Sequence, residues 1–321
     1  MPDKLRIVFM GTPGFAVESL KALIDSGQNV IAVITAPDKP AGRGKQMQSS
    51  PVKNFAIQSG VKTILQPSNL KSPEFIEELK SLRADLQLVV AFRMLPEVVW
   101  TMPRKGTVNL HASLLPDYRG AAPINWAIIN GEKETGVTTF FIEKEIDTGK
   151  IIYREKVPIG PDKTAGELHD ELMIAGANLL VKTVEAITNE TCPAVPQEEY
   201  RKDSRLHPAP KIFKENCQIK WENKASKIHD FIRGLSPYPA SWTEMTDGNT
   251  ITSMKIFKSG IELADHDHET GTMLTDNNQY MKVAVKDGYI HILRLQVAGK
   301  KQLDIKEFLR GFKKADRYKI R

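Results

Sequence analysis

Short apolar segments alternate with amphipathic ones along the first 190 residues. Leu5–Met10 and Val30–Thr35 are continuous apolar runs, typical of strands buried on both faces, and Ala16–Ser26 between them has the period of an amphipathic helix. The alternation continues with strands expected at Lys62–Leu65, Leu86–Phe92, Gly106–His111, Val137–Ile142 and Ile151–Val157, and helices near Pro73–Leu82, Ala122–Asn130 and Ala165–Thr188. This order predicts an α/β domain, Rossmann-like, with a doubly wound and mostly parallel sheet over residues 1–189.

A long polar segment follows the second strand. Residues 36–51, APDKPAGRGKQMQSSP, are so rich in proline and glycine that we expect a loop without regular structure. Loops of this length are usually functional or mobile. Arg43 and Lys45 give this one a positive charge, which suits an anionic ligand.

The pattern changes again after residue 189. Residues 190–210 are polar, proline-rich and without apolar periodicity, so they are interpreted as a linker. Beyond them we expect one helix and then short alternating strands at Lys224–Arg233, Thr252–Phe257, Gly271–Leu274, Met281–Lys286 and Tyr289–Gln296. Asp287-Gly288 joins the last two strands as a hairpin turn. Residues 211–321 are therefore predicted to form a small, OB-like β-barrel.

Composition narrows the class of protein. The 321 residues suit two domains, and 41% apolar residues are enough for buried cores. Cys192 and Cys217 show no metal-ligand spacing, so neither a structural zinc nor a disulfide framework is expected, and a reducing compartment, the cytoplasm, is favoured. The apolar runs are too short for a signal peptide or a membrane helix.

The charge is divided unevenly along the chain. Residues 200–321 carry 23 Lys and Arg against 15 Asp and Glu, whereas residues 1–199 carry 22 against 24. A basic second half favours an anionic macromolecular partner, although a merely solvated basic surface would have the same composition.

The opening strand and glycine turn resemble a dinucleotide-binding motif, but two features argue against it. GTPGFA has Pro13 where the second glycine of GxGxxG lets the backbone approach a pyrophosphate. The second predicted strand also ends in Val33-Ile34-Thr35-Ala36, without the acidic residue that binds the ribose. No nicotinamide cofactor is therefore expected.

Asn109, His111 and Asp147 are the strongest chemical signal. Residues two apart on a strand face the same side, so Asn109 and His111 project together at the carboxyl end of a predicted parallel strand, where open α/β sheets bind ligands. Asp147 lies in a turn after another strand, in EIDTG. An amide, an imidazole and a carboxylate at one edge could polarise a carbonyl and transfer a proton. A single hydrogen-bonded structural histidine is the alternative reading of Asn-x-His.

The segments around these residues resemble a known family. NLHASLLPDYRGAAPINWAIING and VTTFFIEKEIDTGKII are similar to the signature region of the 10-formyltetrahydrofolate-dependent formyltransferases. MGTPGFA, the loop PDKPAGRGKQMQSSPVK, APKI, LSPYPASW and VAGKKQLDIKEFLRG extend the resemblance from near residue 5 to near residue 312. The resemblance implies formyl transfer from 10-formyltetrahydrofolate to the amino group of initiator methionyl-tRNA, for translation initiation, without a metal.

The resemblance also implies roles for residues of this chain. Asn109, His111 and Asp147 would be catalytic. The folate would be held by Ser113, Leu114, Leu115 and Pro116, and by the backbone of Arg93, Met94 and Leu95. The tRNA acceptor stem would contact Arg43, Lys45, Lys211, Lys214 and Lys220.

Two other functions remain open at this point. The first is a formyltransferase that acts on a small amine, such as a glycinamide ribonucleotide or an amino sugar. The second is a non-catalytic RNA-binding protein on an inactive α/β scaffold. The basic C-terminal region favours tRNA over a small amine, and the intact Asn109, His111 and Asp147 favour an enzyme. A monomer is expected, because no large apolar element is left over from the two predicted cores.

Overall fold

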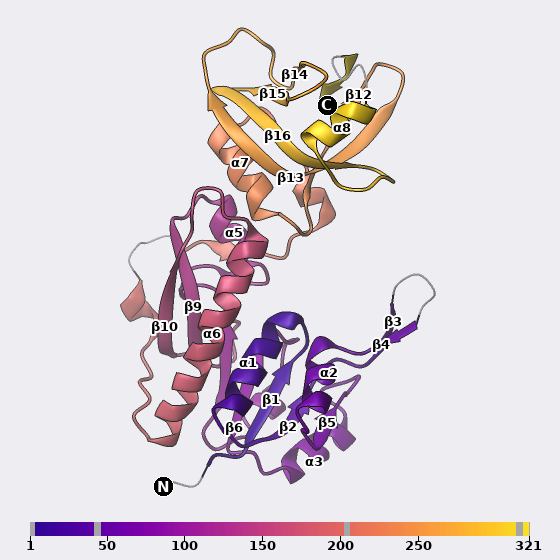
Figure 1. Ribbon diagram of the computed structural model, residues 1–321. Helices are drawn as coiled ribbons and strands as arrows, with labels where there is room; N and C mark the ends of the chain where they lie inside the picture. The colour runs from indigo at the N-terminus through magenta and orange to yellow at the C-terminus, as the bar shows by residue number, and fades with distance from the viewer. Residues whose placement is uncertain (1–3, 42–45, 202–205, 313–316, 321) are drawn as a thin grey trace. The chain divides into compact units, whose positions relative to one another are not determined.

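The computed structural model describes residues 4–41, 46–201, 206–312 and 317–320. The chain divides into two compact units (Figure 1). Unit 1 comprises Met1–Gly120, Thr135–Pro158 and His169–Pro208, and unit 2 comprises Ala121–Glu134, Ile159–Leu168 and Ala209–Arg321.

Unit 1 is built on a seven-stranded sheet in the order β10-β9-β7-β6-β1-β2-β5. The strands are β1 (Ile7–Gly11), β2 (Val30–Ile34), β5 (Thr63–Leu65), β6 (Leu86–Val90), β7 (Thr107–His111), β9 (Glu134–Phe141) and β10 (Ile151–Pro158). The five strands from β7 to β5 are parallel to their neighbours, and β9 is antiparallel to β7. The prediction of a mostly parallel sheet is confirmed.

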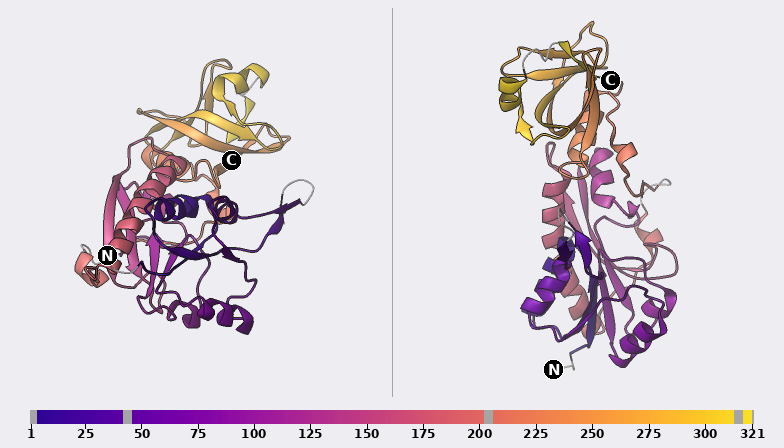
Figure 2. Two further views of the ribbon diagram at one scale, coloured as in Figure 1. Left: turned by 60° about the horizontal axis from the view of Figure 1, so that its bottom comes forward. Right: turned by 90° about the vertical axis from the view of Figure 1, so that its right-hand side faces the viewer.

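Helices cover both faces of this sheet (Figures 1 and 2). The bounds are α1 (Gly14–Asp25), α2 (Pro51–Gln58), α3 (Pro73–Ser81), α4 (Glu97–Trp100) and α6 (Ala165–Thr188). Val8 and Met10 of β1 belong to one buried cluster with Phe75 and Leu79 of α3. On the opposite face, a Cβ added at Gly176 of α6 would meet the Leu110 side chain at 2.8 Å, so this helix packs closely on β7. Burial on both faces explains why these strands are continuous apolar runs.

The segment 36–51 corrects one sequence expectation. Lys39–Ala41 (β3) and Gln46–Gln48 (β4) form an antiparallel pair, with Lys39 opposite Gln48. The prediction of a loop without regular structure was therefore wrong for these residues. All three residues of β4 are exposed, and the strand is too short for its residues to show the alternation that predicts a strand. Arg43 and Lys45 lie outside the described residues.

Unit 2 contains an antiparallel, barrel-like sheet in the order β14-β15-β16-β13-β12-β18, with β17 paired to β16. The strands are β12 (Ser241–Thr246), β13 (Ile251–Leu263), β14 (Met273–Thr275), β15 (Met281–Val285), β16 (Gly288–Val297), β17 (Leu303–Asp304) and β18 (Lys319–Ile320). The helices of this unit are α5 (Pro123–Ile129), α7 (Ala225–Gly234) and α8 (Ile305–Gly311). The prediction of a small β-barrel is confirmed, with β12 and α8 as elements that the pattern missed.

The remaining short elements lie in the segments between these strands and helices. They are β8 (Arg119–Gly120), β11 (Pro208–Ala209) and two 3-10 turns, η1 (Gln197–Tyr200) and η2 (Lys214–Cys217). The segment before η1 is fixed to the start of β10, because Val195 and Ile151 exchange two backbone hydrogen bonds of 2.9 and 2.8 Å.

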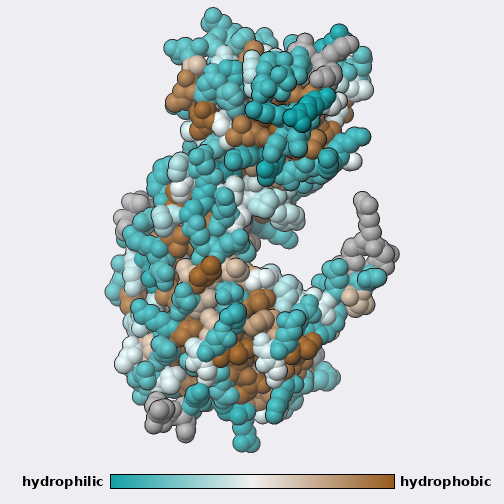
Figure 3. Space-filling model, in the orientation of Figure 1, coloured by the Kyte–Doolittle hydropathy of each residue, from teal (hydrophilic) through white to brown (hydrophobic). Residues whose placement is uncertain are grey.

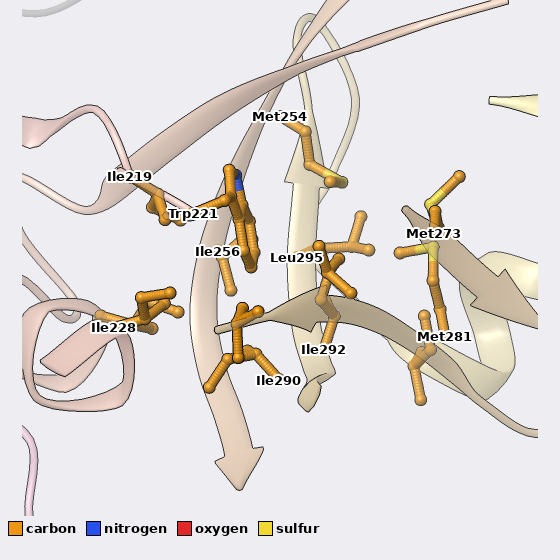
Figure 4. Close-up of a cluster of buried hydrophobic side chains, with 14 of the residues drawn as sticks. Ile219, Trp221, Ile228, Met254, Ile256, Met273, Met281, Ile290, Ile292 and Leu295 are labelled. Carbon is orange, nitrogen blue, oxygen red and sulfur yellow. The ribbon is translucent and has the colours of Figure 1, made fainter. Parts of the chain in front are cut away.

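The core of unit 2 lies between the barrel strands and α7 (Figure 4). Trp221, Ile256 and Leu295 belong to this buried cluster, and the Trp221 indole N–H donates to the Thr243 hydroxyl at 2.9 Å. Hydrophilic residues cover most of the visible outer surface of this unit (Figure 3). Within the described residues, no helix combines the length and the apolar character that spanning a membrane requires.

Candidate active site

The register of the sheet places Asn109 and His111 on one face of β7. Met10, Val89, Asn109 and Phe140 are paired in series across β1, β6, β7 and β9, so their side chains point to the same side. Asn109 is half-buried between Val89 and Phe140. His111, two residues further along, shares this face at the carboxyl end of β7.

The His111 ring is oriented by a backbone carbonyl. Its Nε2 lies 2.9 Å from the carbonyl oxygen of Tyr118, and its Nδ1 lies 3.8 Å from Oδ2 of Asp147. A carbonyl oxygen only accepts, so Nε2 carries a proton and donates it. Nδ1 is therefore the ring atom that faces the carboxylate, and the histidine, 7% exposed, is held between two loops.

Asp147 lies in the turn between β9 and β10 and has φ of +55°. Aspartate tolerates this left-handed conformation better than most residues. The backbone N–H of Gly120 donates to Oδ2 of Asp147 at 3.0 Å, and the carboxylate keeps 13% of its side-chain surface exposed. The turn thus presents a fixed, partly accessible carboxylate to His111, so the structure brings these two predicted residues together.

Thr138 fixes the segment Ser113–Pro116 beside the histidine. The Thr138 residue is paired with His111, and its hydroxyl donates to the Ser113 carbonyl at 2.6 Å and accepts from the Leu115 N–H at 3.2 Å. The Ser113 hydroxyl donates to the Asp117 carbonyl at 2.6 Å. Leu115 packs against Phe140 in a buried cluster. The predicted folate-binding segment is therefore a rigid wall next to His111.

The other members of this segment line the wall. Pro116 is buried, and Leu114 is half-buried against the backbone of Gly136, where an added Cβ would lie 2.5 Å from the leucine side chain. These apolar contacts leave the segment little room to shift.

Arg93, Met94 and Leu95 follow β6, the strand next to β7. The Arg93 guanidinium donates to the carbonyls of Ser68, at 2.9 Å, and Pro67, and burial lowers its pKa from the ordinary value. Leu95 packs on the core that contains Met10, whereas Met94 is 74% exposed. The guanidinium is thus engaged by the loop after β5.

The predicted basic residues of the linker and barrel lie in unit 2 and are exposed. Lys211 has its Nζ 5.2 Å from the centre of the Phe213 ring. Lys211 and Lys214 line a cavity of about 740 Å³ together with Lys255, Tyr238 and Trp242, among others. Lys220 is exposed but is not among the residues that line this cavity. All residues that line the cavity belong to unit 2, whereas His111 and Asp147 belong to unit 1.

Tyr118, Thr138 and Gln197 take part in the site but were not predicted. Tyr118 contacts His111 through its backbone carbonyl. Every residue type has such a carbonyl, so the residue type at this position could not predict the contact. Thr138 was recognisable only as part of a strand. Gln197 lies in the expected linker, 50 positions from Asp147, whose carbonyl accepts from the Gln197 amide at 2.8 Å. Among the described residues, no group of His, Cys, Asp and Glu has an arrangement that could hold a metal.

Comparisons with known proteins identify the family. Residues 5–184 match the model of the formyl transferase family, and residues 211–313 match that of the formyl transferase C-terminal domain. The chain belongs to the formyl transferase family. This formyl transferase is 57% identical to the methionyl-tRNA formyltransferase of Phocaeicola vulgatus, over 98% of both chains. It is 54% identical to that of Bacteroides thetaiotaomicron, over 99% of both.

Solved structures share the fold of this formyl transferase. One is an N-formyltransferase from Helicobacter canadensis in complex with folinic acid and dTDP-3-aminofucose. The match covers 93% of this chain and 100% of that one, with a TM-score of 0.66 and 22% identity. At this identity the likeness concerns the fold.

Proposed function

We propose that this formyl transferase moves the formyl group of 10-formyltetrahydrofolate to the free amino group of initiator methionyl-tRNA. Full-length relatives at 52–57% identity have the name methionyl-tRNA formyltransferase. The observation that carries the proposal is that His111 shares one face of β7 with Asn109 and has its Nδ1 3.8 Å from the Asp147 carboxylate. In this proposal, the formyl carbon and the amine meet at the carboxyl end of β7.

The reaction needs an oxyanion donor and a group that takes a proton. The amine lone pair attacks the formyl carbon, which gives a tetrahedral intermediate with an oxyanion and an ammonium. We assign the Asn109 amide N–H to the oxyanion, because half-buried amide donors stabilise such charge. The oxyanion then re-forms the carbonyl as the bond from the carbon to N10 of the folate breaks, and N10 takes up the proton that left the ammonium.

The contacts of His111 support one of its ring atoms as the proton acceptor. Nε2 is engaged as a donor to the Tyr118 carbonyl, so Nδ1 is the atom that accepts the ammonium proton. The Asp147 carboxylate, 3.8 Å from Nδ1, stabilises the imidazolium that forms. Asp147 thus acts through charge and His111 through proton transfer.

The formyl donor would lie between two backbone segments. Ser113–Pro116 offers a rigid wall next to His111, and Arg93–Leu95 follows the neighbouring strand β6. Both segments supply backbone donors and acceptors with apolar side chains beside them, a combination that suits a planar heterocycle with several polar edges. No protein metal is required for this chemistry.

We propose that the basic C-terminal part of the chain binds the tRNA that carries the acceptor amine. Residues 1–189 form the catalytic domain in this proposal, 190–210 the linker, and 211–321 a barrel that binds tRNA. Lys211, Lys214 and Lys220 are exposed in unit 2, and such residues supply phosphate contacts. Arg43 and Lys45, outside the described residues, would add contacts from the loop between β3 and β4. We further propose that the enzyme works as a monomer in the cytoplasm, which light scattering and cell fractionation can test.

The decisive experiment supplies 10-formyltetrahydrofolate with one acceptor at a time. Charged initiator methionyl-tRNA is expected to take up the formyl group and to release tetrahydrofolate in equal amounts. Free methionine, uncharged tRNA and a dTDP-amino sugar are the matched acceptor controls. Formylation of the amino sugar but not of the charged tRNA would replace the proposed acceptor by a small amine.

A further inference from the structure

The buried amide of Gln197 contacts two segments that are far from it in the sequence. Its Nε2 donates to the backbone oxygens of Asp147 and Gly149, at 2.8 and 2.9 Å. Its Oε1 accepts from Nε and Nη2 of Arg119, at 3.1 and 2.6 Å. The residue is 1% exposed, so its amide is buried, and an unpaired amide group there would be costly. All of these residues belong to unit 1.

The direction of this amide is fixed by its partners. Backbone carbonyls only accept and a guanidinium only donates, so a flipped amide would oppose every contact that it makes. Both donors of the amide group and its oxygen are used. Glutamate, which has nearly the same shape, would keep the contact with Arg119 and lose both donors to the Asp147 turn.

These contacts connect the two loops that hold the proposed catalytic pair. Arg119 directly follows Tyr118, the residue whose carbonyl orients His111. Gly120 comes next and donates its N–H to the Asp147 carboxylate at 3.0 Å. Gln197 therefore ties the loop that orients the imidazole to the turn that presents the carboxylate.

The Asp147 turn needs such support. A non-glycine residue at φ of +55° is in a sparsely populated conformation, which persists only where its surroundings determine it. Gln197 binds the carbonyl of this strained residue and the carbonyl of Gly149, two positions later. It is itself anchored, because the neighbouring Val195 is bonded to Ile151 at the start of β10 by two backbone hydrogen bonds.

We propose that Gln197, together with Arg119, is a positioning residue that sets the separation and orientation of His111 and Asp147 during formyl transfer. The inference rests on the proposed function for its kinetic readout. Gln197 touches neither substrate in this proposal. It acts on kcat through the geometry of the pair, because a displacement of about 1 Å costs on the order of 10²-fold in rate.

The test compares two variants of Gln197 with a control on the same turn. Gln197→Met keeps the volume and removes all of these hydrogen bonds, and Gln197→Glu keeps only the contact with Arg119. Glu199→Gln, an exposed residue of η1, is the control. We expect Gln197→Met to lower kcat by about 10²-fold while KM for each substrate changes less than about threefold. The control is expected to behave as the wild type.

The pH profile of kcat separates positioning from a purely structural role. Gln197→Glu places an additional carboxylate against the backbone of the Asp147 turn, so the pH profile of kcat is expected to move to higher pH. The Glu199→Gln profile is expected to stay in place. If Gln197→Met does not fold, Gln197→Glu carries the test alone. A Gln197→Glu profile that superimposes on the wild type would overturn the inference.

Two further outcomes would overturn it. One is a folded Gln197→Met protein with wild-type kcat, and the other is a loss confined to KM. Hydrogen–deuterium exchange of peptide 144–150, measured without substrates, distinguishes this failure from failure of the proposed function. Faster exchange in Gln197→Met than in the wild type supports the positioning role even if charged tRNA proves not to be the acceptor. Equal exchange in the two proteins removes it.

Discussion

Nδ1 of His111 lies 3.8 Å from Oδ2 of Asp147, while Nε2 of the same ring is held 2.9 Å from the Tyr118 carbonyl. The first distance is within the range of an ion pair but too long for a hydrogen bond. Nδ1 therefore faces a carboxylate without being hydrogen-bonded to it. This arrangement supports the proposed roles of His111 as the proton acceptor and of Asp147 as a fixed negative charge.

Replacing Asp147 by asparagine tests the role of the charge. Asparagine also tolerates a positive φ and can accept the N–H of Gly120, so the turn is expected to keep its conformation. The carboxylate charge is lost, and we expect kcat to fall by about 10²-fold or more, with the melting temperature little changed. Asp147→Ala should lose both activity and stability, because alanine disfavours the left-handed conformation. Near-wild-type single-turnover rates in Asp147→Asn would contradict the assigned role.

Asn109 is expected to affect the chemical step alone. Asn109→Ala removes the proposed oxyanion donor from the middle of β7, and the loss of one such donor costs about 10²–10³-fold in kcat. Substrate affinities measured by equilibrium binding should be retained. Asn54→Ala, an exposed position on α2, is the matched control. Equal rates for the two variants would exclude Asn109 from the site.

The strands of unit 1 were predictable because burial on both faces makes them uniformly apolar. Val8, Val33 and Leu88 are each fully buried, and their segments read as continuous apolar runs. The carboxyl end of β7 then followed from the parallel topology, and with it the positions of Asn109 and His111. Local sequence and one topological rule were sufficient for this part of the site.

Other elements could not be predicted because their signal is not local. The inward-facing Ser241 and Thr243 of β12 are fully buried but polar, so the strand shows no apolar alternation. The Thr243 hydroxyl is paired with the Trp221 indole, a contact that only the folded barrel creates. Gln197 lies in a polar, proline-rich segment, and its importance arises from partners 50 and 78 positions away.

The turn that carries Asp147 also depends on Gly149, where there is no room for a side chain. A Cβ at Gly149 would lie 1.7 Å from the Phe141 carbonyl oxygen, a backbone atom that cannot rotate away. Gly149→Ala is therefore expected to cost at least about 1–3 kcal/mol of unfolding free energy, as overpacked sites do. Gly160→Ala, where the nearest atom is 3.9 Å from the added Cβ, is the control. Denaturant titration of both variants measures the difference, and equal midpoints would contradict the expected clash.

A capping interaction at the start of α6 predicts how stability depends on pH. The backbone N–H and the hydroxyl of Thr164 both donate to the Glu167 carboxylate at 2.8 Å, and these hydrogen bonds lower the pKa of Glu167 from its ordinary value of 4.5. The contribution is complete above the unfolded value and is lost as the pH falls through the lower, folded value. The wild type should therefore melt at a higher temperature than Glu167→Gln at pH 7, and the difference should disappear in acid, well below pH 4.5.

Calorimetry at several pH values checks this expectation. Glu78→Gln, an exposed position on α3, controls for the loss of one surface carboxylate. A stability difference between the wild type and Glu167→Gln that stays constant from pH 7 into acid would assign it to packing and not to the ionised cap.

The basic residues of unit 2 predict a salt dependence for tRNA binding. Each phosphate contact contributes about 0.9 to the slope of log affinity against log salt on duplex nucleic acid, and about 0.7 on a single strand. Lys211 and Lys214 are exposed and line one cavity. The double variant Lys211→Ala, Lys214→Ala should therefore bind charged tRNA more weakly, with a slope smaller by roughly 1.4–1.8. KM for the folate should be unchanged, because these lysines belong to unit 2 and the proposed folate segments to unit 1. Lys21→Ala, which removes an exposed lysine of α1, should leave the slope unaltered. A double variant with the wild-type slope would remove this cavity from the RNA interface.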